Sequence, residues 1–234
     1  MKSVVSDLQK LANKERAAHS SRYFKNGKGE YGEGDIFLGI QVPIERAIAR
    51  KYTSLSIGEV SELLRSPIHN FRQTALFIMT YQWKKADADE REDLYNQYLR
   101  NINRINNWDL VDCSAPIIIG EYLQDKRKER KILYRFAKSK NIWERRIAIL
   151  STFAFLRNKD LDDTMKLAEI LINDKQDLMQ KAVGWALREV GKRDEKVLVD
   201  FLAVHYKTMP RTTLRYAIEK FSFSRRHSYL TGTI

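Results

Sequence analysis

The sequence predicts an all-α protein built as an α-solenoid, a stack of helix pairs. The chain of 234 residues holds only 10 Gly and 4 Pro, so long stretches lack helix breakers. Similar segments are centred on Trp108, Trp143, Leu178 and Thr213, which follow one another at steps of 35 residues. A repeat of this length has room for two helices, and stacked repeats of this kind form solenoids. A plain helical bundle is the alternative.

Apolar residues recur at helical spacing within each repeat, and this spacing sets the expected helices. One helix of each pair, here called the inner helix, is expected within residues 70–79, 106–112, 141–150, 177–187 and 211–221. Its partner is expected within residues 88–102, 125–139, 160–174 and 194–208. Ser56 with Glu59, and Asp87 with Glu90, have the spacing of a capping box. We expect residues 1–234 to form a single domain that ends in a tail at 223–234.

Residues 22–40 interrupt the helical pattern. Four glycines fall close together between two short apolar runs, at positions Gly27, Gly29, Gly32 and Gly34. The segment therefore predicts a short β-hairpin or a Gly-rich loop. It lacks the Gly-Lys-Ser/Thr ending of a nucleotide-binding loop. The segment is either a basic hairpin that touches the ligand through Lys25 and Lys28, or a solvent loop without function.

The charge of the chain favours a polyanionic partner. Lys and Arg total 42 against 30 Asp and Glu, which gives a formal net charge of +12. Nucleic acid is the first expectation and an anionic membrane surface the second. The expected inner helices would line a concave groove with cations, namely Arg72, Arg145, Arg146, Lys181, Arg188, Arg211 and Arg215. Such a groove suits a phosphate backbone; a solvated basic face without a ligand is the alternative.

Other features of the composition exclude several classes of protein. Cys113 is the only cysteine, so no intramolecular disulfide can form, and a cytoplasmic setting fits. The four histidines are scattered without metal-ligand spacing, and we expect neither a metal nor a cofactor. The first 20 residues lack the apolar core of a secretory signal, and no apolar run is long enough to span a bilayer. We expect a monomer with no membrane partner.

The segment Asn106–Asp112 is the strongest candidate for a chemical site. Trp108 and Asp112 are four residues apart, so on a helix they share one face. A carboxylate is costly to bury without a partner. Trp185 and Arg188, on a later inner helix, are the next candidates. The alternative is that Asp112 forms a structural ion pair, for instance with Arg146.

Four segments resemble the AlkD-type DNA alkylation repair proteins, which are bacterial HEAT-like repeat proteins that hold duplex DNA in a concave basic channel. The segments are NNWDLVD, NIWERRIAIL, QKAVGWALREVGK and FLGIQVPIERAI, and the resemblance covers roughly residues 36–221. It implies hydrolysis of the N-glycosidic bond of cationic alkylated purines, such as 3-methyladenine and 7-methylguanine. In the glycosylase of this type the base is not flipped into a pocket, unlike the usual extrusion route.

The resemblance also implies roles for individual residues. Asp112 matches the catalytic aspartate of the family. Trp108 and Trp185 match the aromatic residues that flank the deoxyribose of the lesion, and Arg146 matches an arginine that contacts DNA nearby. A DNA repair protein of this kind would be associated with the bacterial nucleoid.

Two departures from the family pattern keep a second function open. The glycine-rich stretch 25–34 stands where the AlkD glycosylase has a short helix, and Asn107 stands where a second tryptophan is expected. A related subgroup, AlkF and AlkG, carries a β-hairpin in this region and resembles a binder of branched DNA. The alternative function is therefore non-catalytic binding of branched or distorted DNA. A protein-interaction solenoid that takes an acidic peptide is a third reading.

Overall fold

The all-α fold is confirmed. The computed structural model describes residues 1–234, which form two compact units, residues 1–122 and 123–234. The regular elements are helices, and the one β-bridge, between Ile36 and Ile68, belongs to no strand. No helix is long and apolar enough to cross a membrane. That the whole chain acts as one domain stays a prediction.

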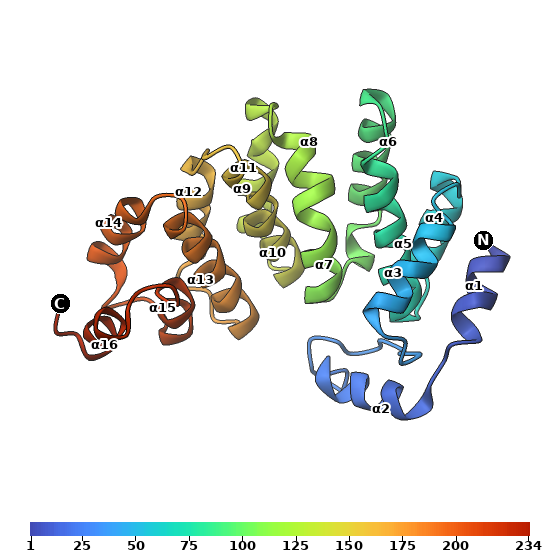
Figure 1. The fold of residues 1–234 in the computed structure, drawn as a ribbon, viewed down its shortest axis with the longest axis horizontal. Coiled ribbons are helices and arrows are strands. Elements are labelled where there is room, and N and C mark those ends of the chain that lie inside the picture. Colours follow the sequence, from blue (N-terminus) through green and yellow to red (C-terminus); the bar gives the residue numbers. More distant parts are fainter. The chain divides into compact units, whose positions relative to one another are not determined.

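The first unit is built around one buried helix, α5 (Figure 1). In chain order the unit contains α1 (Lys2–Gln9), α2 (Lys14–Tyr23), α3 (Val42–Lys51), α4 (Ile57–Leu64), α5 (His69–Trp83), α6 (Ala88–Arg100), the 3-10 turn η1 (Ile102–Arg104), α7 (Trp108–Ala115) and the π-helical turn η2 (Pro116–Gly120). Helices α3, α4 and α7 pack against α5, whose side chains are buried almost throughout. A helix surrounded on several sides buries its polar residues too, and α5 therefore carries buried His69, Arg72 and Gln73.

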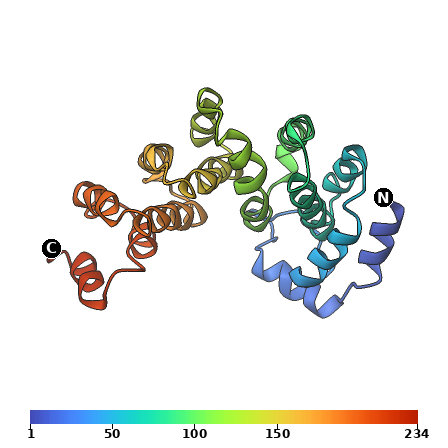
Figure 2. The same ribbon diagram turned by 45° about the horizontal axis from the view of Figure 1, so that its top comes forward.

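The second unit repeats a simpler pairing of helices. It contains η3 (Arg127–Arg130), α9 (Lys131–Ala137), α10 (Ile142–Ser151), α11 (Phe153–Leu156), α12 (Asp162–Leu171), α13 (Asp177–Gly191), α14 (Glu195–His205), α15 (Arg211–Ala217) and α16 (Phe223–Thr231); α8 (Glu121–Leu123) spans the boundary between the units. The pairs α9–α10 and α12–α13 lie side by side, as Figure 2 shows. The expected C-terminal tail is a helix up to Thr231.

The repeat in the sequence corresponds to a repeat of helix starts. Trp108, Trp143, Leu178 and Thr213 each fall within the first three residues of α7, α10, α13 and α15. Both expected capping boxes are present, at Ser56 and Asp87. The start of α7 is fixed by its own cap, Asn107, whose side chain accepts a hydrogen bond from the N–H of Trp108 and so places Trp108 in the first turn.

The glycine-rich segment is a loop and not a β-hairpin. Residues 24–35 form turns, in which the amide N–H groups of Gly27 and Gly29 donate to the carboxylates of Glu30 and Glu33. These local bonds replace the cross-strand ladder of a hairpin. Lys25 and Lys28 are exposed on this loop, and Asp35 at its end turns into the interior.

Gly39 fixes the path that connects this loop to α3. Its φ is +72°, and a Cβ there would collide with the backbone oxygen of Asn13 and the backbone nitrogen of Ala17, at the start of α2. Asn13 caps α2 and donates its own N–H to the carbonyl of Leu38 at 2.8 Å. Glycine is therefore needed here for both its φ and its size.

We expect Gly39→Ala to lower the free energy of unfolding by about 2 kcal/mol or more, because backbone strain and a clash with α2 add together. Gly29→Ala is the matched control, since Gly29 has φ +79° but nothing within 4 Å of the added Cβ. The control is expected to lose about 1 kcal/mol from strain alone. Urea unfolding of the two variants measures the difference, and equal losses would show that the close approach to α2 is unimportant.

Candidate active site

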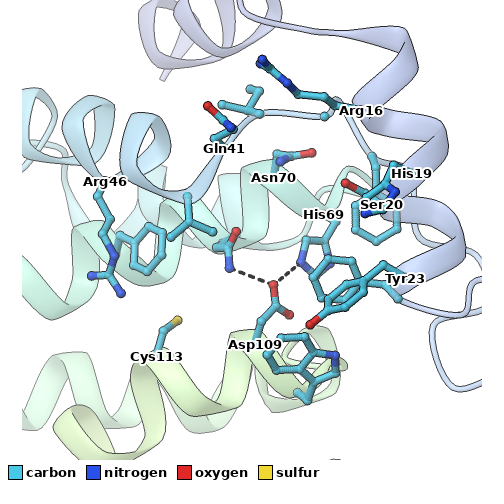
Figure 3. A pocket seen from close by; sticks show the side chains of 18 of the residues that line it. Arg16, His19, Ser20, Tyr23, Gln41, Arg46, His69, Asn70, Asp109 and Cys113 are labelled. Atoms are coloured by element: carbon cyan, nitrogen blue, oxygen red, sulfur yellow. Dashed lines mark hydrogen bonds and ion pairs between the residues drawn. The ribbon is translucent and has the colours of Figure 1, made fainter.

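A cavity of about 680 Å³ lies in the first unit, and Figure 3 shows side chains that line it. Its walls come from α2, α3, α5 and α7, and Trp108 and Asp112 both line it. Their shared face on α7 is thus confirmed. Both residues are half-buried, so the cavity holds an acid beside an indole ring within reach of a ligand. Cys113 lines the same cavity, where burial raises the pKa of its thiol well above the usual value.

Aromatic side chains from the end of α2 complete the wall beside Trp108. The ring of Phe24 stacks on Trp108 with centroids 5.3 Å apart, and Phe37 stacks on Phe24 at 5.1 Å. Tyr23 meets Trp108 edge-on at 6.0 Å and remains 60% exposed. These aromatic contacts could not be predicted from the sequence, because Tyr23 and Phe24 stand at the edge of the glycine-rich segment, far from Trp108 in the chain.

A second carboxylate, Asp109, lies on the same helix but is fully occupied by protein donors. Its Oδ2 accepts hydrogen bonds from Nε2 of His69 and Nε2 of Gln73, both at 2.8 Å (Figure 3). Its Oδ1 accepts from the backbone N–H of Leu110 at 2.9 Å. Asp109 therefore anchors α7 to α5, and Asp112 is the second acid that lines the cavity.

His69 joins Asp109 to a third carboxylate, Asp35. The distance from Nδ1 of His69 to Oδ2 of Asp35 is 2.9 Å, and Nη2 of Arg72 lies 2.5 Å from Oδ1 of Asp35. Asn107 caps α7 and also donates to Asp35, at 3.3 Å. Burial would raise the pKa of Asp35, but His69 and Arg72 outweigh it and hold that pKa below its usual value. Acidic and basic groups thus alternate through the interior behind the cavity.

Arg72 corrects one expectation of the sequence analysis. It was expected in a DNA-binding groove, but its side chain is 1% exposed. Besides Asp35, its guanidinium donates to the carbonyl oxygens of Ser66 and Pro67 at 3.1 and 3.2 Å. A guanidinium held in this way cannot reach a phosphate. Helical periodicity placed Arg72 on an exposed face, but α5 is packed on several sides, so this arginine lies in the core and is paired there with Asp35.

The other cations predicted for the groove lie on the second unit, where Arg145 and Arg188 are paired with acids. Arg145 forms an ion pair with Asp174 at 2.6 Å, and Arg188 forms one with Glu219. These ion pairs hold helices of the second unit together, so the two guanidinium groups contribute less to the binding of DNA phosphates.

The remaining predicted residues of the second unit differ in exposure. Arg146 is buried and donates to the carbonyl oxygen of Leu178 at 2.6 Å, whereas Lys181 is 40% exposed and pairs with Asp177 at 2.6 Å. Arg211 and Arg215 are both exposed on α15. Trp185 is half-buried and meets Phe153 edge-on at 4.8 Å. The roles expected of Arg146 and Trp185 beside Asp112 stay predictions.

Two arginines at the cavity were missed by sequence reasoning. Arg16 of α2 and Arg46 of α3 both line it, and neither forms an ion pair with an acid. The guanidinium of Arg46 lies 4.1 Å from the ring centroid of Phe77, which holds it in place by a cation–π contact. Arg46 lies within the FLGIQVPIERAI segment, so the resemblance noted there could have pointed to it.

A fold of helix pairs and a strongly basic chain are together typical of helical-repeat proteins that bind a polyanion such as DNA. The sequence matches the family model described as "DNA alkylation repair enzyme" over residues 4–221. The chain belongs to this DNA alkylation repair family, which implies DNA as its partner. No curated protein matches the sequence at a significant level.

Solved structures share the fold. A "Predicted DNA alkylation repair enzyme" from Enterococcus faecalis aligns with a TM-score of 0.70 and 17% identity, over 91% of this chain and 98% of that chain. AlkD2 from Streptococcus mutans aligns with a TM-score of 0.56 and 17% identity, over 90% of this chain and 99% of that chain. Identities this low show a common fold, and the chemistry has to be argued from the residues themselves.

Proposed function

We propose that the protein binds damaged duplex DNA and hydrolyses the N-glycosidic bond of alkylated purines such as 3-methyladenine and 7-methylguanine. One observation carries the proposal: Asp112 and Trp108 line the same cavity in a member of a DNA alkylation repair family. These are the two residues to which the AlkD-type resemblance assigns the catalytic and the sugar-flanking roles.

The chemistry of the lesion explains the need for a carboxylate. Alkylation at N3 or N7 gives the purine a positive charge and makes it a good leaving group. When the glycosidic bond breaks, its electron pair goes to the purine, which leaves neutral, and positive charge develops at C1′ of the deoxyribose. The carboxylate of Asp112 stabilises that charge and orients the water that adds to C1′. The water gives up one proton, which passes to Asp112 or to solvent.

Aromatic and cationic residues supply the remaining contacts in this proposal. The electron-rich faces of Trp108 and Trp185 stabilise the positive sugar by cation–π interaction. The phosphates are contacted by exposed or cavity-lining cations, which are Arg16, Lys25, Lys28, Arg46, Lys181, Arg211 and Arg215. Binding through phosphates releases counterions, so the affinity for DNA falls steeply as salt rises.

A direct assay tests the proposal on the wild-type protein. Methylated duplex DNA is incubated with the protein, and released purines are separated and quantified against the spontaneous rate. Affinities for linear duplex and for three- and four-way junctions are measured on the same preparation. Release of methylated purine above the spontaneous rate is the expected result. Release at the spontaneous rate, combined with tighter binding to junctions than to linear duplex, would overturn the proposal and favour a protein that binds branched DNA. That alternative was based on a β-hairpin, and residues 24–35 form turns instead.

A further inference from the structure

Both ring nitrogens of His69 face carboxylate oxygens, at 2.9 Å for Asp35 and 2.8 Å for Asp109. An ionised carboxylate only accepts hydrogen bonds. Asp109 already accepts from Gln73 and Leu110, and Asp35 already accepts from Arg72, so both acids behave as ionised acceptors. Each nitrogen of His69 must therefore carry a proton. The geometry alone indicates an imidazolium ring, although the residue is 1% exposed.

The charges around this ring balance. Asp35 comes from the loop and Asp109 from α7, while Arg72 stands one turn further along α5. Glu45 of α3 is a further ionisable neighbour, and burial, only partly offset by a hydrogen bond from Asn70, raises its pKa to about 8. Two cations thus face two anions. A buried set of charges is tolerated when it is paired and hydrogen-bonded in this way.

We propose that His69 is a positioning residue for the reaction assigned to Asp112: its doubly protonated ring ties Asp109 to Asp35 and so fixes the first turn of α7. Trp108 immediately precedes Asp109 in that turn, and Asp112 follows it by three residues. The inference rests on the proposed function, but the geometry of the ring stands by itself. A small displacement of a catalytic group lowers a rate strongly, since the reacting atoms must be aligned.

The inference predicts a loss of function at high pH. Burial and Arg72 would lower the pKa of His69, but Asp109 and Asp35 outweigh them and raise it to about 9. Above that pH the ring keeps a single N–H and cannot donate to both acids. One of the two hydrogen bonds, either to Asp35 of the loop or to Asp109 of α7, is then lost, and the ring no longer connects the loop to α7. Activity that depends on this link is present below the pKa of His69 and disappears as the pH rises through it.

The experiment compares His69→Gln with Glu45→Gln. Release of 3-methyladenine is followed in single turnover from pH 7 to 10, after subtraction of spontaneous release. We expect wild type to lose activity about tenfold across this range. At pH 7.5 the rate of His69→Gln should be about tenfold below that of wild type, and above this pH it should stay constant. The protein concentration that gives half the maximal single-turnover rate should change little. Glu45→Gln removes the other group that titrates in this range, and it should keep the wild-type fall.

A second readout does not depend on base release. The ring carbons of His69, assigned by their disappearance in His69→Gln, are followed by NMR, together with the indole signal of Trp108. Both should titrate near pH 9 in wild type and in Glu45→Gln. If wild type releases no base, the proposed function fails and this arm alone decides the inference. A His69 ring that loses its proton below pH 7, or a folded His69→Gln variant that keeps the alkaline fall, would overturn it.

Discussion

Asp112→Asn is expected to slow the release of alkylated purine by about 10²-fold or more, with DNA binding nearly unchanged. The amide keeps the shape of the side chain but has no negative charge to set against the positive charge that develops at C1′. The affinity for DNA comes mainly from cations on phosphates, so it should change little. Single-turnover release and a binding titration on the same protein separate the two effects.

The matched control for this variant is Asp93→Asn. Asp93 is an exposed carboxylate on α6 in the same unit, outside the cavity. The Asp93→Asn variant removes one negative charge, as Asp112→Asn does, but leaves the proposed site unchanged. Its rate of purine release should therefore equal that of wild type. If Asp112→Asn retained more than half of the wild-type rate, Asp112 would be a structural acid and another group would have to stabilise the sugar.

The largest loss of stability is expected from Asp35→Ala, at about 3–5 kcal/mol. Asp35 is buried, and its carboxylate is the shared partner of His69 and Arg72. Its removal leaves the buried guanidinium of Arg72 without its anion and leaves Asp109 as the only acid paired with His69, so a buried charge loses its partner. The same change removes the side-chain contacts of Asp35 with α5 and leaves only the hydrogen bonds of Ile36 and Leu38 to hold the end of the glycine-rich loop there. Urea unfolding at pH 7 measures the loss.

Asp200→Ala serves as the comparison for Asp35→Ala. Asp200 also forms an ion pair, with Lys196 at 2.5 Å, but its side chain is 61% exposed. Solvent replaces such a pair at little cost, so the unfolding midpoint should stay almost unchanged. Similar midpoints for the two variants would mean that the buried charges behind the cavity contribute no more to folding than a surface pair.

Much of the fold could be predicted because its signals are local. The capping residues Ser56 and Asp87 act on amides three residues away, and this spacing is visible in the sequence. The repeat predicted where α7, α10, α13 and α15 begin, because helix starts recur when repeats stack. Trp108 and Asp112 were placed on one face by helix geometry alone.

By itself, the sequence determined the helix pairs, the basic charge and the Trp108–Asp112 face, since each follows from spacing or composition. Only the tertiary structure decided that Arg72 is a core residue and that Asp109 is tied to His69 and Gln73 of α5. The contacts responsible join residues 34 and 40 positions apart, from His69 to Asp35 and to Asp109. No periodic pattern encodes such pairs, because burial and partners arise from the packing of distant segments around α5.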